Sequence, residues 1–136
     1  MPVQMHSMGW LPDYPDFRDY TTEHAAISPL LKKIGLTGSH TKSLPESADL
    51  RAWCSTIEDQ GSLGSCTAQA GASMVEYFAH RSMDRYTDVS RLFLYKVTRN
   101  LMRQKGDTGA FIRTTMGALV LFGVPPELYW PYKEKD

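Results

Sequence analysis

Apolar residues recur at helical spacing in three stretches of the second half of the chain, which predicts three amphipathic helices sharing one core. The first begins at Cys66, the second covers about residues 90–104 and the third about 110–122. The second helix is expected to turn some side chains inward (Phe93, Val97, Leu101) and others outward (Arg91, Lys96, Arg99, Arg103). Gly123 and the prolines behind it end the third helix.

The first 43 residues follow a different pattern, in which prolines and glycines interrupt the apolar runs. Segment 9–20, GWLPDYPDFRDY, mixes aromatic residues with Pro-Asp turns, and a residue before proline avoids the helical region, so extended chain is expected. Residues 28–36 predict a short helix capped by Ser28. We place a boundary near Leu44, between a leader, residues 1–43, and a helical domain, residues 44–136.

Composition and charge fit an ordinary globular protein of about one domain, with 136 residues of which 42% are hydrophobic and 22% charged. Fifteen basic residues balance fifteen acidic ones, so we expect neither nucleic acid nor a membrane surface as partner. No apolar run reaches the roughly 20 residues of a membrane span. The first residues lack the basic stretch and apolar core of a secretory signal, so a cytoplasmic location is the default expectation.

The candidate chemistry centres on two cysteines, which are too few for a disulfide scaffold and too far apart for a zinc site, so no metal or cofactor is implied. Cys66 opens a predicted helix, where unpaired N–H groups and the positive end of the helix dipole favour the nucleophilic thiolate. Gln60 offers an amide donor that, with the Cys66 N–H, can stabilise an oxyanion. A cysteine at a helix start is also commonly a plain core residue, and for Cys54 we expect that role.

The spacing Gln60-Gly-x-x-Gly-Ser-Cys66 resembles the active-site segment of papain-like cysteine peptidases, in which a glutamine six residues before the nucleophile serves the oxyanion hole. Gly64, Ser65 and Cys66 match the family signature, whereas Leu63 stands where the family has its first cysteine. The resemblance therefore implies that the family's usual nearby disulfide is absent.

Other segments extend this resemblance. Residues 44–51, LPESADLR, resemble the start of the mature domain; 88–95, DVSRLFLY, the second helix; and 106–132 the glycine loop, third helix and Tyr-Pro-Tyr turn. Segment 9–20 resembles the leader of a bacterial-type branch. The implied fold is mainly α, the helical (left) half of the papain-like α+β architecture, with an extended N-terminal leader that is a candidate pro-segment.

The resemblance also implies a substrate cleft for an extended peptide or protein substrate. Gly109, together with Asp107 and Thr108, is expected to line this cleft and to hydrogen-bond to the peptide. Gly64 and Ser65, next to the nucleophile, are expected to lie along it as well.

The family's catalytic histidine lies about 130 to 150 residues past the cysteine, beyond Asp136. His80 cannot replace it, because it lies about 20 Å along the helix from Cys66 at 1.5 Å per residue. His6, His24 and His40 fit no motif of the family. We therefore expect a complementary β-rich half to carry the histidine and asparagine.

Three functions stay open. The first is a cysteine-type peptidase that cleaves peptide bonds through an acyl-thioester, with this chain as a fragment lacking the catalytic His and Asn. The second is a non-catalytic papain-like remnant that acts as a protein-binding module. The third, a thiol redox protein using Cys54 and Cys66, is the weakest because oxidoreductases pair their cysteines closely.

Overall fold

The computed structural model describes residues 9–36 and 45–134. Contacts divide these residues into two compact units, one of residues 9–13 with 50–134 and the other of residues 14–36 with 45–49. His6, His40 and the predicted boundary near Leu44 lie outside the described residues.

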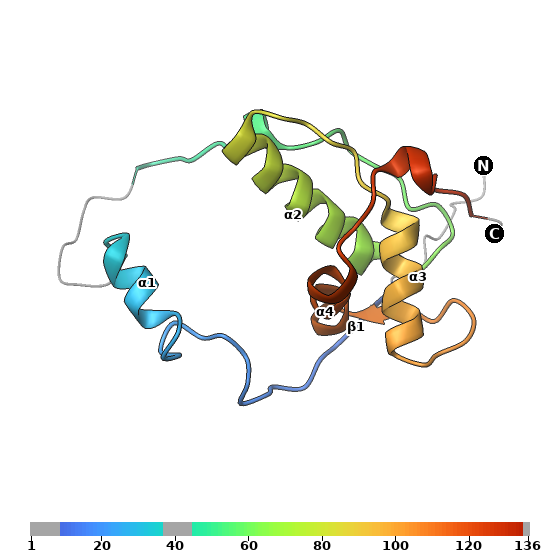
Figure 1. Ribbon diagram of the computed structural model, residues 1–136, viewed down its shortest axis with the longest axis horizontal. Helices are drawn as coiled ribbons and strands as arrows, with labels where there is room; N and C mark the ends of the chain where they lie inside the picture. Colours follow the sequence, from blue (N-terminus) through green and yellow to red (C-terminus); the bar gives the residue numbers. More distant parts are fainter. Residues whose placement is uncertain (1–8, 37–44, 135–136) are drawn as a thin grey trace. The chain divides into compact units, whose positions relative to one another are not determined.

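Three helices build the larger unit, as the apolar periodicity predicts: α2 (Cys66–Met83), α3 (Arg91–Leu101) and α4 (Ile112–Phe122). They pack against one another, and the C-terminal segment with the 3-10 helix η2 (Glu127–Tyr129) returns beside α3 (Figure 1). A second 3-10 turn, η1 (Arg51–Trp53), contacts α2. The mainly α fold class is confirmed.

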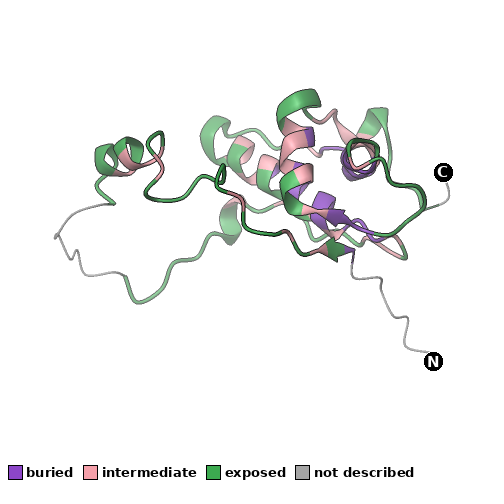
Figure 2. Ribbon diagram, turned by 90° about the horizontal axis from the view of Figure 1, so that it is seen from below, coloured by how far each residue is buried: buried purple, intermediate pink, exposed green. Residues whose placement is uncertain are grey.

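The core lies where the three helices face each other (Figure 2), and its centre consists of Ala68, Leu94, Tyr95, Ala110 and Ala118. Small residues on α2 let the neighbouring helices approach closely. A Cβ atom at Gly71 would lie 3.2 Å from both Leu94 on α3 and Thr115 on α4. A larger side chain at this position would push all three helices apart.

The predicted outward direction of Arg91 and Arg99 on α3 is wrong, because both arginines are buried. Leu92 and Leu94 are also buried, whereas Leu101, predicted inward, is 38% exposed. Acidic side chains from segments before and after α3 surround the Arg91 guanidinium, and the loop that directly follows α3 supplies the partners of Arg99. A helical pattern read along one segment cannot reveal such loops.

The predicted extended segment is confirmed at its start, where β1 (Trp10–Leu11) pairs in parallel with β2 (Ala110–Phe111). The sequence pattern predicts these two residues of β2 as helical, but α4 begins at Ile112, two residues later than expected. The pairing brings residues about 100 positions apart together, at the edge of the helical core.

The smaller unit contains α1 (Ser28–Lys33). The helix is one residue longer at its start than predicted, because Ile27 occupies the cap position and Ser28 lies inside the first turn. Gly35, with φ +73°, ends it as expected. Within the described residues, no helix combines the length and apolar character needed to span a membrane.

Candidate active site

Cys66 is the first residue of α2, as predicted. Its side chain is half-buried, while Gly64 and Ser65 before it are buried. The first N–H groups of a helix have no acceptor within the helix, so they point toward any anion at this end. The sulfur therefore lies where a thiolate gains from the helix dipole.

Ser65 occupies the cap position but makes no capping hydrogen bond with its side chain. Its hydroxyl lies 2.6 Å from the Tyr132 hydroxyl instead. Tyr132 in turn donates to the backbone oxygen of Gln60 at 2.8 Å. Burial raises the pKa of Tyr132, which keeps its phenol protonated. No local pattern predicts these contacts, because Tyr132 lies 67 residues from Ser65 and 72 residues from Gln60.

Gln60 lies at the start of the loop that leads into α2. Its side-chain Nε2 donates to the Leu63 oxygen at 2.8 Å, which closes the loop over Gly61, where φ is +57°. The oxyanion role of Gln60 stays a prediction.

Asp107 joins the glycine loop to the nucleophile loop. Its two carboxylate oxygens accept the Gly64 N–H at 2.9 and 3.1 Å, and one also accepts the Tyr95 hydroxyl. Burial, and then the bond to Asp107, raise the pKa of Tyr95. In these contacts Asp107 holds two loops together, and its predicted substrate contact is untested. The exposed Thr108 donates to Gln104 at 3.3 Å.

Gly109 is buried and has φ +83°, a conformation that favours glycine. A Cβ atom here would lie 2.3 Å from the Gly9 oxygen, and a Cβ atom at Gly9 would lie 1.7 Å from the Gly64 oxygen. The Ala110 N–H donates to the Gly9 oxygen at 2.7 Å. Three glycine backbones thus touch, and the segment from Gly9 lies against two predicted substrate-binding residues.

Arg99 fixes the glycine loop from inside. Its guanidinium donates to the backbone oxygens of Gly109 (2.6 Å), Gly106 (2.5 Å) and Lys105 (3.1 Å), and to the Gln104 side chain (2.7 Å). Four bonds to residues 104–109 define the path of the loop. This positive group was predicted at the surface and was missed as part of the site.

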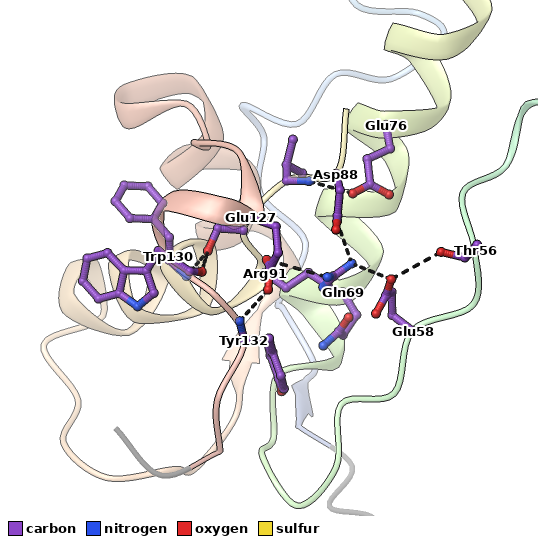
Figure 3. A network of polar contacts seen from close by, with 12 residues as sticks. Thr56, Glu58, Gln69, Glu76, Asp88, Arg91, Glu127, Trp130 and Tyr132 are labelled. Carbon is purple, nitrogen blue, oxygen red and sulfur yellow. Dashed lines mark hydrogen bonds and ion pairs between the residues drawn. The ribbon is translucent and has the colours of Figure 1, made fainter. Parts of the chain in front are cut away.

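A second polar network anchors the C-terminal segment that carries Tyr132. Figure 3 shows Arg91 at its centre, with carboxylates from Glu58 (3.3 Å), Asp88 (3.3 Å) and Glu127 (3.6 Å) around it. Glu127 also accepts the Tyr132 N–H. Burial raises the pKa of Glu127.

The other candidate groups lie apart from this arrangement. Cys54 is exposed, so the expected core role is wrong, and both cysteines are free thiols. The His80 ring packs edge-on against Trp53 with centroids 5.5 Å apart, far along α2 from the helix start. Within the described residues, no group of three His, Cys, Asp or Glu side chains is placed to hold a metal ion.

Comparison with known sequences gives one curated relative. The chain is 41% identical over 76 residues to an uncharacterized peptidase C1-like protein of Acanthamoeba polyphaga mimivirus. The match covers 54% of this chain and 24% of the viral protein. No protein-family model matches the chain.

Comparison with solved structures finds cysteine proteases. Xylellain, a cysteine protease from Xylella fastidiosa, matches with a TM-score of 0.69 and 30% identity over 98% of this chain and 47% of its own. Digestive procathepsin L 3 of Tenebrio molitor larval midgut gives 0.59 and 25% over 71% and 32%. The ragweed pollen allergen Amb a 11, a cysteine protease in its proform, gives 0.57 and 20% over 79% and 35%. The chain thus spans less than half of each protein.

Proposed function

Because this chain has the fold of the helical half of the papain-like cysteine peptidases, as the match to xylellain and the cathepsin L-like relative establishes, we propose that it supplies the nucleophile of a cysteine-type peptidase. The single observation that carries the proposal is the position of Cys66 at the start of α2, beside the loop of Gln60. The likeness to xylellain also agrees with the bacterial-type branch.

In the proposed reaction, the Cys66 thiolate attacks the carbonyl carbon of a peptide bond. The Cys66 N–H and the Gln60 amide stabilise the oxyanion. When the carbon–nitrogen bond breaks, the amine leaves with a proton from a histidine, and water then hydrolyses the thioester. The proposal assigns that histidine and its asparagine to a β-rich half, which this chain, at 47% of the length of xylellain, does not span.

The proposed substrate is an extended peptide that lies along Gly64 and Gly109. Both backbones approach that of Gly9 closely: a Cβ atom at Gly109 would lie 2.3 Å from the Gly9 oxygen, and a Cβ atom at Gly9 would lie 1.7 Å from the Gly64 oxygen. Such close backbone approach supports a site for main-chain contacts. Asp107 and Thr108 complete this edge of the proposed cleft, together with Ser65, which directly precedes the nucleophile. The substrate side-chain preference belongs to the other half.

A labelling experiment tests the nucleophile. The chain is treated with an epoxide thiol reagent at pH 5 to 6, and modification is mapped by mass spectrometry. Cys66 should react at least about tenfold faster than Cys54, which serves as the control thiol in the same chain. Equal and slow modification of both would overturn the proposal.

The runner-up is a non-catalytic binding module. Met74 and Phe78 lie one turn apart on α2 and are 41% and 58% exposed, which supports an unfilled apolar face. The intact mass of the natural protein separates the two functions. A chain that continues to a histidine and an asparagine favours the peptidase, whereas a natural protein limited to these residues favours the module.

We also propose that the leader, residues 1–43, acts as a pro-segment. The contact of Gly9 with Gly64 and Gly109 supports this role, since it occupies the edge where the substrate backbone is expected. Trimming the leader from the complete enzyme should raise its activity on a small fluorogenic peptide. Unchanged activity after trimming would contradict the pro-segment.

A further inference from the structure

We propose that Tyr132 is a positioning residue that prevents Ser65 from capping α2 and thereby leaves the N–H groups at the helix start to Cys66. The inference rests on the proposed nucleophile. Tyr132 lies 66 positions beyond the cysteine (132 minus 66). The inference gives this tyrosine a part in setting the reactivity of the Cys66 sulfur.

The argument begins with the protons of the two hydroxyl groups. Tyr132 has one proton, which it donates to the Gln60 oxygen at 2.8 Å. The 2.6 Å contact with Ser65 must then use the serine proton, with the phenol oxygen as acceptor. The Ser65 hydroxyl therefore points its proton at Tyr132.

Serine at a cap position normally does the opposite. Its backbone is extended, and its oxygen accepts the N–H two or three residues later, which satisfies one of the unpaired groups. Ser65 has φ −97° and ψ 14°, outside that extended region, and makes no side-chain capping bond. On α3 the same residue type behaves normally: Ser90, with ψ 103°, accepts the Phe93 N–H at 3.1 Å.

The two serines thus form an internal comparison. Both precede a helix and both are fully buried. Both hydroxyl groups donate to an oxygen of the C-terminal segment, that of the Trp130 backbone for Ser90 and that of the Tyr132 phenol for Ser65. The difference is what each then accepts: Ser90, at ψ 103°, accepts the helix N–H, whereas Ser65, at ψ 14°, accepts the Gln69 side-chain N–H at 3.5 Å. Ser65 is thus held in a non-capping conformation by a bridge across the nucleophile loop.

Tyr132 is itself fixed in place. Glu127 accepts its N–H, and Glu127 belongs to the Arg91 network of Figure 3. Burial raises the pKa of the Tyr132 phenol most, and the charges of Glu134 and Asp107 raise it further, so the phenol keeps its proton. An uncharged phenol can hold the serine without adding charge next to a thiolate.

The consequence concerns the competition for the helix N–H groups. The Ala68 N–H already donates to the Ser65 backbone oxygen at 2.9 Å. If Ser65 were released, it could adopt the extended conformation and its hydroxyl oxygen could accept the Thr67 N–H. That N–H would then contribute less to a thiolate at Cys66 or to an oxyanion formed there. Tyr132 would thus influence the sulfur without touching the substrate.

The test measures the rate of alkylation of Cys66 by iodoacetamide from pH 4 to 9, with mass spectrometry to separate it from Cys54. In Tyr132→Phe, the midpoint of the pH–rate curve should rise by about 0.5 to 1 unit, which slows alkylation about three- to tenfold on its acid side. The double variant Tyr132→Phe/Ser65→Ala should return toward the wild-type midpoint, because alanine cannot cap. Tyr129→Phe, an exposed tyrosine of the same segment, is the matched control.

The outcomes distinguish failure of the proposed function from failure of the inference about Tyr132. A wild-type Cys66 no more reactive than Cys54 overturns the proposed function. An activated Cys66 with an unchanged midpoint in Tyr132→Phe overturns only the inference about Tyr132. A raised midpoint that persists in the double variant also overturns it, because general loosening of the loop would not be rescued by removing the serine hydroxyl.

Discussion

Asp107 accepts the Gly64 N–H with both of its carboxylate oxygens, at 2.9 and 3.1 Å. This pair ties the glycine loop to the loop that carries the nucleophile, although the two residues are 43 positions apart. Leu63 stands where the resembled family has a cysteine, and neither free cysteine of the described residues lies in the glycine loop. A polar contact thus connects two loops that no disulfide joins here.

The first prediction concerns this contact. Asp107→Asn leaves one acceptor oxygen and places an N–H₂ group near the Gly64 N–H. We expect the unfolding free energy to fall by about 1–2 kcal/mol, and the Gly64 amide to exchange faster with deuterium. The Phe93 amide, held by Ser90 on α3, is the internal control and should keep its protection. Unchanged exchange at Gly64 would contradict the role of Asp107.

The second prediction concerns Arg99. Arg99→Met removes the four hydrogen bonds that hold residues 104–109 and leaves the buried Gly109 oxygen without this donor. We expect a loss of about 2–3 kcal/mol in urea unfolding. Arg103→Met, at an exposed position of the same segment, should change stability by no more than about 0.5 kcal/mol. Equal effects of the two substitutions would refute the anchoring role.

These contacts show where sequence reasoning succeeded and where it failed. Local patterns predicted α2, its start at Cys66 and the end of α4 at Gly123, because apolar spacing, glycine and proline act within a few residues. The same reasoning placed Arg99 in solvent, since its partners are oxygens of the irregular loop that follows α3, whose path helical periodicity does not define. A sequence holds no local sign of where a backbone oxygen will lie.

The site was likewise only partly predictable. The resemblance to the papain-like peptidases implies Gly64 and Gly109 as cleft residues, and the structure brings both against Gly9. Tyr132 was seen only as part of an aromatic turn. Its contact with Ser65 depends on the return of the C-terminal segment past α3, which follows from the Arg91 network rather than from any motif.

The third prediction concerns pH. Burial raises the pKa of Glu127 above its ordinary value of 4.5, so the folded state binds this proton more tightly than the unfolded state does. Its contribution to stability is therefore present at low pH and is lost as pH rises through the folded pKa. Glu127→Gln, which still offers an oxygen to the Tyr132 N–H, should gain stability relative to wild type as pH rises from about 4 toward 7.

Urea unfolding of both proteins at several pH values measures this difference. The expected result is a steeper decline for the wild type just above pH 4.5. Leu128→Ala, at the neighbouring exposed position, removes no titratable group, so it is the control and should run parallel to wild type over that range. A wild type that gains stability relative to Glu127→Gln as pH rises would show that the Arg91 ion pair outweighs the cost of burial.

The last prediction concerns the leader segment. Gly9→Ala would place a Cβ atom 1.7 Å from the Gly64 oxygen, and because that atom belongs to the backbone it cannot rotate away. The segment 9–13 should therefore detach from β2, while the three-helix core stays folded. The Ala110 amide, which donates to the Gly9 oxygen at 2.7 Å, should lose about tenfold or more of its protection against deuterium exchange. Gly117→Ala is the control, because its new Cβ atom would lie in open space with no contact within 4 Å, so the Ala110 amide should keep its protection in that variant. Full protection of Ala110 in Gly9→Ala would mean that this amide is shielded without Gly9, which would contradict the proposed contact between the leader and the cleft.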